Sequence, residues 1–460
     1  MSLGSRLVAV VLPVLLLVGA GFPASAVAPV ATTLTVSATA GYADRTAQVA
    51  VGLRGSGGDP VAGAQVTVER RTAGEWAVVG TLVTDPAGEA VLSATRSRVA
   101  ADNAFRASYA GDADHSASAA GPVTAALTRR TSVLALDVPD SVVDETSTTL
   151  RVRWSTRNGL PVEGEVRLYR RAAGHDWKRV STLRTDADGE ASIEVRPRVD
   201  TRWKAQVAAL DWASAAKTAS YALDNLPPNR PVSLPKAAPS PRVKVPAQRR
   251  AVGAGANAKV SRIPDGVWRR MTGISWHSGC PVGRSGLRYL SINYWDYSGY
   301  RRRGALVANK DAVGQMSGAL TDLYASGLPL RSLYPIDRFG YSSRLRGGND
   351  YRSMAAGNSS AFNCRSVVNK PGVRSPHSYG RSLDLNTWEN PYRSATGLVP
   401  NSWWQAHRHP RVAWRTRAHA VVRILAAHGL RWTYGVGDTQ HFDAAAPDGR
   451  ILVVPDCVCD

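Results

Sequence analysis

The chain has 460 residues, which allows roughly three domains of ordinary size, each long enough to bury a core. Lysine and arginine number 57 against 36 aspartates and glutamates, for a formal net charge of +21. Such a charge draws a protein to polyanions. No nucleic-acid-binding motif accompanies it, so we expect no nucleic-acid partner. Anionic cell-wall polymers and lipid headgroups are the expected alternatives, and an arginine-rich genome composition would give the same charge.

Residues 1–26 have the pattern of a secretory signal peptide. Arg6 precedes an apolar run at 7–22, and the stretch ends in the small residues Ala24-Ser25-Ala26. The run is shorter than the span of about 20 residues that an uncleaved membrane anchor needs. We therefore expect a secreted protein, extracellular or associated with the cell wall, without a transmembrane anchor after signal removal.

Two stretches, residues 31–127 and 131–223, alternate apolar and polar residues between Gly, Pro and Asp turns, which is typical of β-strands. The second stretch repeats motifs of the first about 100 residues later. The matching pairs are Pro60-Val61 with Pro161-Val162, Trp76 with Trp177, and Thr84-Asp85 with Thr185-Asp186. We predict two copies of one β-sandwich. They resemble immunoglobulin-like modules of exported bacterial proteins, which would either bind the wall or act as spacers.

Residues 224–259 change in composition, because seven prolines are interleaved there with arginine and lysine. We expect an extended, semi-rigid linker without a core. The last domain, residues 260–446, has the pattern of an α+β fold. One helix is predicted from an N-cap at Asp311 to a stop at Gly327, and a second from Pro410 to Gly429. Short strands are predicted at residues 287–294, 382–385 and 429–432.

The four cysteines, Cys280, Cys364, Cys457 and Cys459, lie in the last part of the chain. Export permits disulfides, and four cysteines allow three pairings. A Cys457–Cys459 bridge would close a very tight ring. We therefore expect the cysteines of the tail, residues 447–460, to pair with Cys280 or Cys364. A structural zinc on the four is disfavoured because the CxxC spacing is absent.

Two short segments combine the residues that a catalytic metal needs. His377 is followed by Gly380, which permits an unusual backbone conformation. Asp384 lies between two leucines, where a charge is costly unless it is paired or bound to metal. Asp438 and His441 follow a glycine-rich turn. Two imidazoles and a carboxylate suit Zn²⁺ and leave one position for water, and Asp438 could act on that water.

The first segment, Ser375-x-His377-x-x-Gly380-x-Ser382-x-Asp384, resembles the S-x-H-x-x-G-x-A-x-D signature of D-alanyl-D-alanine carboxypeptidase-like, VanY-type zinc peptidases. The second, Asp438-x-x-His441, resembles their D/E-x-x-H motif. The resemblance covers residues 260–446. It implies a zinc metallopeptidase that cleaves peptidoglycan stem peptides, as a D,D-carboxypeptidase or as an L-Ala-D-Glu endopeptidase (L,D-endopeptidase). The alternative is a non-catalytic wall-binding protein with an inactive peptidase domain. We thus predict two all-β immunoglobulin-like sandwiches followed by an α+β zinc peptidase domain.

The resemblance also implies roles for single residues. One Zn²⁺ would be bound by His377, Asp384 and His441. Asp438 would act as general base and then as proton donor to the leaving amine. Since carboxypeptidases of this group often have Glu at that position, the bond that is cleaved stays open.

Three further positions carry expectations from the same resemblance. Arg365 would contact the substrate and the developing oxyanion, although it could instead pair with a surface carboxylate. Ser375 would hydrogen-bond the substrate or support the site. Ser382 stands where the family usually has alanine, and serine is also small.

Overall fold

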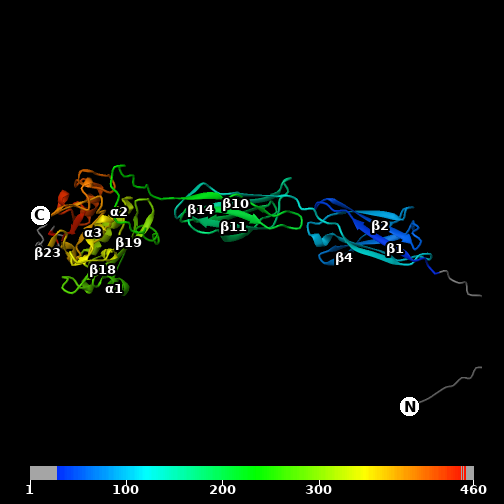
Figure 1. The fold of residues 1–460 in the computed structure, drawn as a ribbon, viewed down its shortest axis with the longest axis horizontal. Coiled ribbons are helices and arrows are strands. Elements are labelled where there is room, and N and C mark those ends of the chain that lie inside the picture. Colours follow the sequence, from blue (N-terminus) through cyan, green and yellow to red (C-terminus); the bar gives the residue numbers. More distant parts are fainter. Residues whose placement is uncertain (1–27, 447, 449, 452–460) are drawn as a thin grey trace, which may run out of the picture.

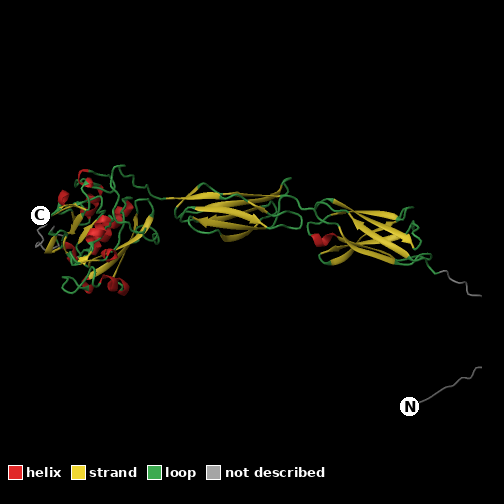
Figure 2. Ribbon diagram, viewed as in Figure 1, coloured by secondary structure: helices red, strands yellow, loops and turns green. Residues whose placement is uncertain are grey.

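The computed structural model describes residues 28–446, 448, 450 and 451. The predicted signal at 1–26, together with Cys457 and Cys459, lies outside this part of the chain. Three bodies follow one another along the long axis in chain order (Figure 1). The first two consist mainly of strands, and the third mixes strands with short helices (Figure 2). The protein is therefore multidomain and mostly β. Among the described residues, no helix has the length and apolar character that a membrane crossing requires.

The first body consists of two antiparallel sheets, with the strand orders β1-β2-β5 and β4-β3-β6-β7. Its elements are β1 (Thr32–Ala38), β2 (Thr46–Gly55), β3 (Gln65–Thr72), β4 (Glu75–Val83), β5 (Glu89–Thr95), η1 (Ala100–Asn103), β6 (Ala104–Tyr109) and β7 (Ser118–Thr124). Alternate side chains of each strand point to the same side. Val49 and Leu53 of one sheet and Val66 and Phe105 of the other share one buried core. The two sheets therefore pack face to face.

The second body also has two sheets, with strand orders β13-β10-β8 and β12-β11-β14-β16-β9, which are antiparallel except for the parallel pair β16–β9. Its strands are β8 (Ser132–Asp137), β9 (Ser141–Val143), β10 (Thr148–Thr156), β11 (Glu165–Ala172), β12 (Lys178–Arg184), β13 (Glu190–Val195), β14 (Thr201–Val207), β15 (Ala216–Lys217) and β16 (Tyr221–Leu226). Trp154 of one sheet and Trp203 of the other are buried in its core.

A repeated hydrogen bond shows why the two sequences echo each other. The buried Thr84 hydroxyl donates to the carbonyl of Val61 at 2.6 Å. The buried Thr185 hydroxyl donates to the carbonyl of Val162 at 2.7 Å. The repeated residues thus make the same hydrogen bond between two loops in both bodies.

The third body is built around two small sheets, with the strand orders β17-β18-β19 and β24-β28-β27. Its sheet strands are β17 (Lys259–Ser261), β18 (Leu287–Trp295), β19 (Arg301–Asn309), β24 (Ser382–Asp384), β27 (Leu430–Arg431) and β28 (His441–Ala444). Its hairpin strands are β20 (Tyr341–Ser342), β21 (Gly347–Gly348), β22 (Ser366–Val367), β23 (Lys370–Arg374), β25 (Tyr392–Ser394) and β26 (Gly397–Val399). One buried core joins both sheets to the longest helix, α2.

The helices of the third body are short. They are α1 (Asp265–Met271), α2 (Val313–Ala325), α3 (Asp350–Ala355) and α4 (Ala420–Ala427), with 3₁₀ turns η2 (Arg284–Gly286), η3 (Ile336–Phe339), η4 (Pro376–Tyr379), η5 (Trp403–Ala406) and η6 (Gly435–Gly437). The first predicted helix is present as α2, although Ala312 occupies the N-cap position and Asp311 pairs with Arg381 at 2.6 Å. The second prediction places the helix start too early, because His409 and Ala413 hydrogen-bond to each other as a turn before α4 begins.

The proline-rich segment differs from the prediction. β16 extends to Leu226, so the first residues of the expected linker belong to the sheet of the second body. Residues 227–258, here called the strap, are extended but lie fastened along the third body. The Val243 N–H donates to the last carbonyl of α3 at 3.1 Å, and Trp388 donates its indole N–H to Pro239 at 2.7 Å. The expectation of a linker without a core is wrong because the strap contributes side chains to the cores of the third body.

Ion pairs also join the second body to the third. The Asp144 carboxylate of the second body is fully buried and lies 2.9 Å from both Arg198 and Arg250, the latter in the strap. Glu145 pairs with Arg301 of β19. A buried carboxylate is tolerated only when it is paired in this way. The two bodies are therefore held together by side chains as well as by the continuous backbone.

Candidate metal centre

The strand pair β24–β28 places two of the predicted ligands side by side. The antiparallel register sets Asp384 directly opposite His441 and Leu383 opposite Phe442. Since successive residues of a strand point to opposite sides, the two pairs face opposite ways. Leu383 and Phe442 lie in the core of the third body, with no exposed surface. The apolar side thus anchors the strands, and the polar side faces a cavity.

His377 reaches the same cavity from the 3₁₀ turn η4. The turn ends at Gly380, whose φ of 68° lies in the left-handed region that favours glycine. A Cβ at this position would come within 2.8 Å of the Asn309 backbone nitrogen, so a side chain would also clash. The unusual backbone predicted at Gly380 is therefore present. It turns the chain from His377 into β24.

The three side chains converge with lone pairs facing one another. His377 Nε2 lies 3.1 Å from His441 Nδ1 and 3.2 Å from Asp384 Oδ2, and His441 Nδ1 lies 3.1 Å from Asp384 Oδ1. The other ring nitrogens have acceptors as partners: His377 Nδ1 donates to the Ala361 carbonyl at 2.7 Å, and His441 Nε2 donates to Asp443 at 2.8 Å. In the neutral tautomers, no hydrogen lies between the two facing ring nitrogens and the carboxylate of Asp384.

This geometry fits a small divalent cation. Two buried ring nitrogens and a carboxylate this close repel one another unless a positive charge lies between them. Ligand atoms 2.0–2.1 Å from a tetrahedral ion are about 3.3–3.4 Å apart, close to the separations of the facing atoms. Two imidazole nitrogens and one carboxylate oxygen form a donor set that suits Zn²⁺. The residues present could hold this ion without rearrangement.

The electrostatics of the cluster point the same way. Burial raises the pKa of Asp384, but His377 and His441 outweigh it and hold that pKa well below the usual range. Burial lowers the pKa of His441, but Asp443 and Asp384 raise it well above the usual range. The cluster therefore favours a positive charge, and a proton on His441 or a divalent cation can supply it.

A supporting residue that the sequence analysis missed is Asp443, which lies opposite Ser382 in the β24–β28 register. It accepts hydrogen bonds from Ser382 Oγ at 2.6 Å and from Thr433 Oγ1 at 2.8 Å, in addition to the His441 ring. The serine that departs from the family signature thus holds this carboxylate. The available signal was the His441-x-Asp443 spacing, which places both side chains on one side of a strand.

The other predicted site residues line the same cavity, which has a volume of about 30 Å³. That is room for an ion or a water-sized group. The lining includes His377, Asp384, His441, Asp438, Arg365 and Ser375, together with Asp350, Tyr392, Tyr434 and Gln440. The structure thus gathers every residue to which the resemblance gave a role in ligand binding or catalysis.

Arg365 is held by a partner that the sequence analysis did not identify. Its Nη2 lies 2.5 Å from the Asp350 carboxylate of α3, and its Nη1 donates to the Ser366 carbonyl at 2.9 Å. Asp350 is buried, so the alternative of a surface carboxylate as partner is wrong. The buried Nε–H of Arg365 has no hydrogen-bond partner among the described residues. The guanidinium is therefore positioned on the cavity wall with its Nε–H left unpaired by the described residues.

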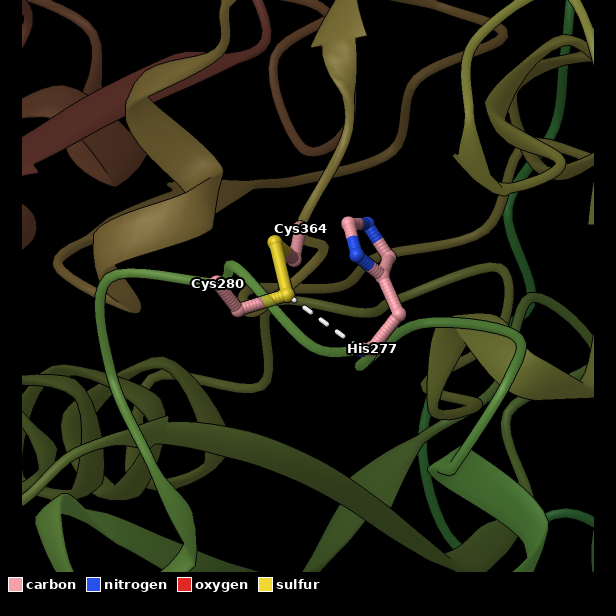
Figure 3. Close-up of side chains that lie close together, drawn as sticks. All are labelled: His277, Cys280 and Cys364. Carbon is pink, nitrogen blue, oxygen red and sulfur yellow. Dashed lines mark hydrogen bonds between the residues drawn. A yellow bond between two sulfur atoms is a disulfide. The ribbon is translucent and has the colours of Figure 1, made fainter.

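Cys280 and Cys364 form a disulfide with each other, with their Cα atoms 5.9 Å apart. The expectation that either pairs with the C-terminal tail is therefore wrong. His277 lies beside the bond, and its backbone N–H donates to Cys280 Sγ at 3.2 Å (Figure 3). These three residues have ligand-type atoms within reach of one another, but the disulfide occupies both sulfurs. The disulfide instead restrains Cys364, the residue immediately before Arg365.

The cavity thus brings together two imidazoles and one carboxylate, a donor set that suits one Zn²⁺, with the Asp438 carboxylate on its wall. The comparisons with known families agree. Residues 368–444 match the model of a family described as D-alanyl-D-alanine carboxypeptidase. The matched segment contains His377, Asp384, Asp438 and His441, so the predicted resemblance to this peptidase family is confirmed for this part of the chain.

The other comparisons add less. No curated protein matches the chain. Similar solved structures include a Salmonella alpha-2-macroglobulin reacted with methylamine (12% identity, 58% of this chain and 18% of that chain, TM-score 0.20). They also include a marsupial T cell receptor (11%, 59% and 98%, TM-score 0.21) and a tandem of titin Ig domains (9%, 43% and 98%, TM-score 0.22). At these scores the likenesses carry no argument.

Proposed function

We propose that the protein is an exported, zinc-dependent peptidase that hydrolyses peptidoglycan stem peptides. The observation that carries the proposal is the convergence of His377, Asp384 and His441 within 3.1–3.2 Å, with lone pairs facing one another. The family match over the same segment supports it. In this proposal, two immunoglobulin-like sandwiches at residues 31–127 and 131–223 carry the peptidase domain, which includes the strap.

The chemistry follows from the residues around the cavity. Zn²⁺ held by His377, Asp384 and His441 would polarise the scissile carbonyl and lower the pKa of water towards neutrality. Asp438 on the cavity wall would take the proton from the attacking water and pass it to the leaving amine. Arg365, with its spare Nε–H, would stabilise the negative charge that develops on the carbonyl oxygen. Ser375 would orient the peptide in this arrangement.

The cleaved bond distinguishes two forms of the proposal. A carboxypeptidase removes the terminal D-Ala from a stem peptide, whereas an endopeptidase splits the bond between L-Ala and D-Glu. The description of the matched family favours the first. Digestion of defined muropeptides followed by mass spectrometry separates the two, because the product masses differ.

The proposal is tested by zinc content and activity measured together. We expect about one Zn²⁺ per chain and loss of peptide hydrolysis in Asp438→Ala, with the metal retained. Asp322→Asn, which changes an exposed carboxylate paired with His428, is the control and should keep both. A purified protein that binds no zinc, or that binds zinc but cleaves no muropeptide, would instead support the wall-binding protein with an inactive peptidase domain.

A further inference from the structure

Three neighbouring strands of the larger sheet of the second body, β12, β11 and β14, carry a concentration of positive charge on their outer face. We call it the basic face and define it by six residues: Arg167, Arg171, Arg179, Arg184, Arg202 and Lys204. All are exposed except Lys204, which is half-buried. The only acidic residue among the outward positions of these strands is Glu165. A sheet face with this imbalance has a strongly positive local potential.

The first body supplies an internal reference for this face. In the first body, Glu69 lies between Val78 of β4 and Arg106 of β6. In the second, Tyr169 lies in the same way between Arg179 of β12 and Lys204 of β14. These registers align the two sheets residue by residue.

The aligned positions differ chiefly in charge. Four cations of the basic face, Arg167, Arg179, Arg184 and Arg202, stand where the first body has Thr67, Val78, Val83 and Ala104. Over the ten outward positions, the first body has two basic residues and one acidic residue, whereas the second has six and one. The fold of the sandwich does not require these cations, since the same face is built without them in the first body.

The opposite face of the second body argues against a general excess of arginine as the cause. There Arg151 lies 4.0 Å from Asp137, and Arg153 lies 3.7 Å from Glu190, so its cations have carboxylates beside them. On the basic face, the only ion pair among the described residues joins Arg184 to Glu163 at 2.8 Å. A compositional bias would act on both faces of the sandwich alike.

Aromatic rings accompany the cations. The Lys204 ammonium lies 4.5 Å from the Trp177 ring centroid and 5.7 Å from that of Tyr169, and the Arg171 guanidinium lies 5.1 Å from Trp177. Cations and rings mixed in this way suit a chain that alternates charged groups with apolar carbon surface. On one side of a sheet, residues recur about every 6.8 Å along a strand, and strands lie about 4.8 Å apart. The basic face thus holds its six cations at fixed positions on three neighbouring strands.

We propose that the basic face of the second body binds a linear polyanion of the wall, a polymer whose polyol or sugar units are joined by phosphodiesters. Guanidinium groups pair well with phosphate, and several contacts along one polymer add together. The first body lacks these cations at the aligned positions and serves as a spacer. This extends the proposed function by naming the wall component that retains the enzyme. It does not depend on catalysis, because the basic face and the metal centre lie in different bodies.

The test replaces the four cations by the residues that the first body carries at the same positions. The variant is Arg167→Thr, Arg179→Val, Arg184→Val and Arg202→Ala in the full chain. Co-sedimentation with purified walls is measured in the presence of a chelator, so that hydrolysis plays no part. We expect binding to weaken by about tenfold to a hundredfold at low salt and to depend less steeply on salt concentration. The control, Arg151→Ala with Arg153→Ala, removes cations from the opposite face and should bind like the parent.

A second variant guards against a folding defect in the first. Thr67→Arg, Val78→Arg, Val83→Arg and Ala104→Arg place the same cations on the first body, and wall binding should increase. Walls stripped of phosphodiester polymers by acid should bind the parent no better than the four-residue variant. Equal binding by the parent and the variant, or binding that survives stripping, would overturn the proposal. Retention on anionic lipid vesicles but not on walls would also overturn it and would assign the face to a membrane.

Discussion

Replacing Asp443 by asparagine removes one negative charge behind the metal centre and preserves the shape of the side chain. The Asp443 carboxylate accepts hydrogen bonds from His441 Nε2 at 2.8 Å, Ser382 Oγ at 2.6 Å and Thr433 Oγ1 at 2.8 Å. The amide oxygen of asparagine can still accept from the His441 ring. The new NH₂ group then stands at the position of Oδ2, and the Thr433 hydroxyl can rotate to accept from it. The change therefore tests the charge of this partner more than its geometry.

The magnitude follows from the role of the carboxylate. Outer partners that orient a metal-binding imidazole and raise its basicity contribute a factor of about 10–100 to metal affinity. That corresponds to about 1.4–2.8 kcal/mol. Asp443 is almost completely buried, so solvent screens its effect on His441 very little. We therefore expect the zinc affinity of Asp443→Asn to be at least tenfold weaker than that of the parent.

The assay is competition for Zn²⁺ with a chromophoric chelator over a series of pH values, extrapolated to the proton-free site, because Asp443 also stabilises the proton that zinc displaces from His441. Asp322→Asn is a matched control, because Asp322 lies 2.7 Å from His428 Nε2 but outside the metal cavity. The control should bind zinc like the parent. If Asp443→Asn also binds zinc with unchanged affinity while keeping the parent melting temperature, the hydrogen bond to His441 does not tune the metal, and the reasoning is refuted.

Three further predictions follow from the same region. Because carboxylates raise the pKa of His441 in the metal-free protein, zinc must displace a proton from this ring. The zinc affinity should therefore rise about tenfold per pH unit below that pKa, and calorimetry in two buffers should measure the released proton. A zinc affinity that does not change with pH would contradict this prediction. Asp350→Asn removes the ion pair that holds the Arg365 guanidinium, so kcat/KM should fall at least about tenfold while the zinc content stays unchanged. If the variant has the kinetics of the parent, Arg365 does not need the ion pair with Asp350. Replacing Cys280 and Cys364 by serine opens a loop spanning 84 residues and should lower the free energy of unfolding by about 2–4 kcal/mol; an unchanged denaturation midpoint would refute this.

The sequence analysis identified the three residues that converge in the cavity because their local environment was informative. Asp384 stands between leucines, and in the structure those neighbours are core while the carboxylate turns to the cavity. Gly380 indicated a turn that no other residue fits. Asp443 and Asp350 were missed for a different reason. Each acts through contacts that form only in the folded chain: Asp443 with the His441 ring and two hydroxyl groups, and Asp350 with Arg365. The His441-x-Asp443 spacing was a signal for the first, and Asp350 stands in no motif that marks it.

The errors have a common physical cause. The second helix was predicted to begin at Pro410 because the apolar Val412 and Trp414 follow it. Both residues are buried in a loop, and buried loop residues have the same apolar character as one face of a helix. The strap was taken for a free linker since proline favours extended chain whether or not that chain packs against a surface. Tertiary contacts determine both the start of the helix and the packing of the strap, and the amino-acid composition does not reveal those contacts.

The contacts of the strap limit how far the metal centre can move relative to the second body. A free tether of the same length would let a peptidase search a wide sphere around its point of attachment. Here residues 227–258 are bound along their course, and Asp144 and Glu145 secure the junction with the neighbouring body. If the second body is held on a polymer strand, the enzyme can reach only bonds within a narrow shell around that strand. The peptide bonds that are cleaved would then be those that lie close to the polymer in the wall.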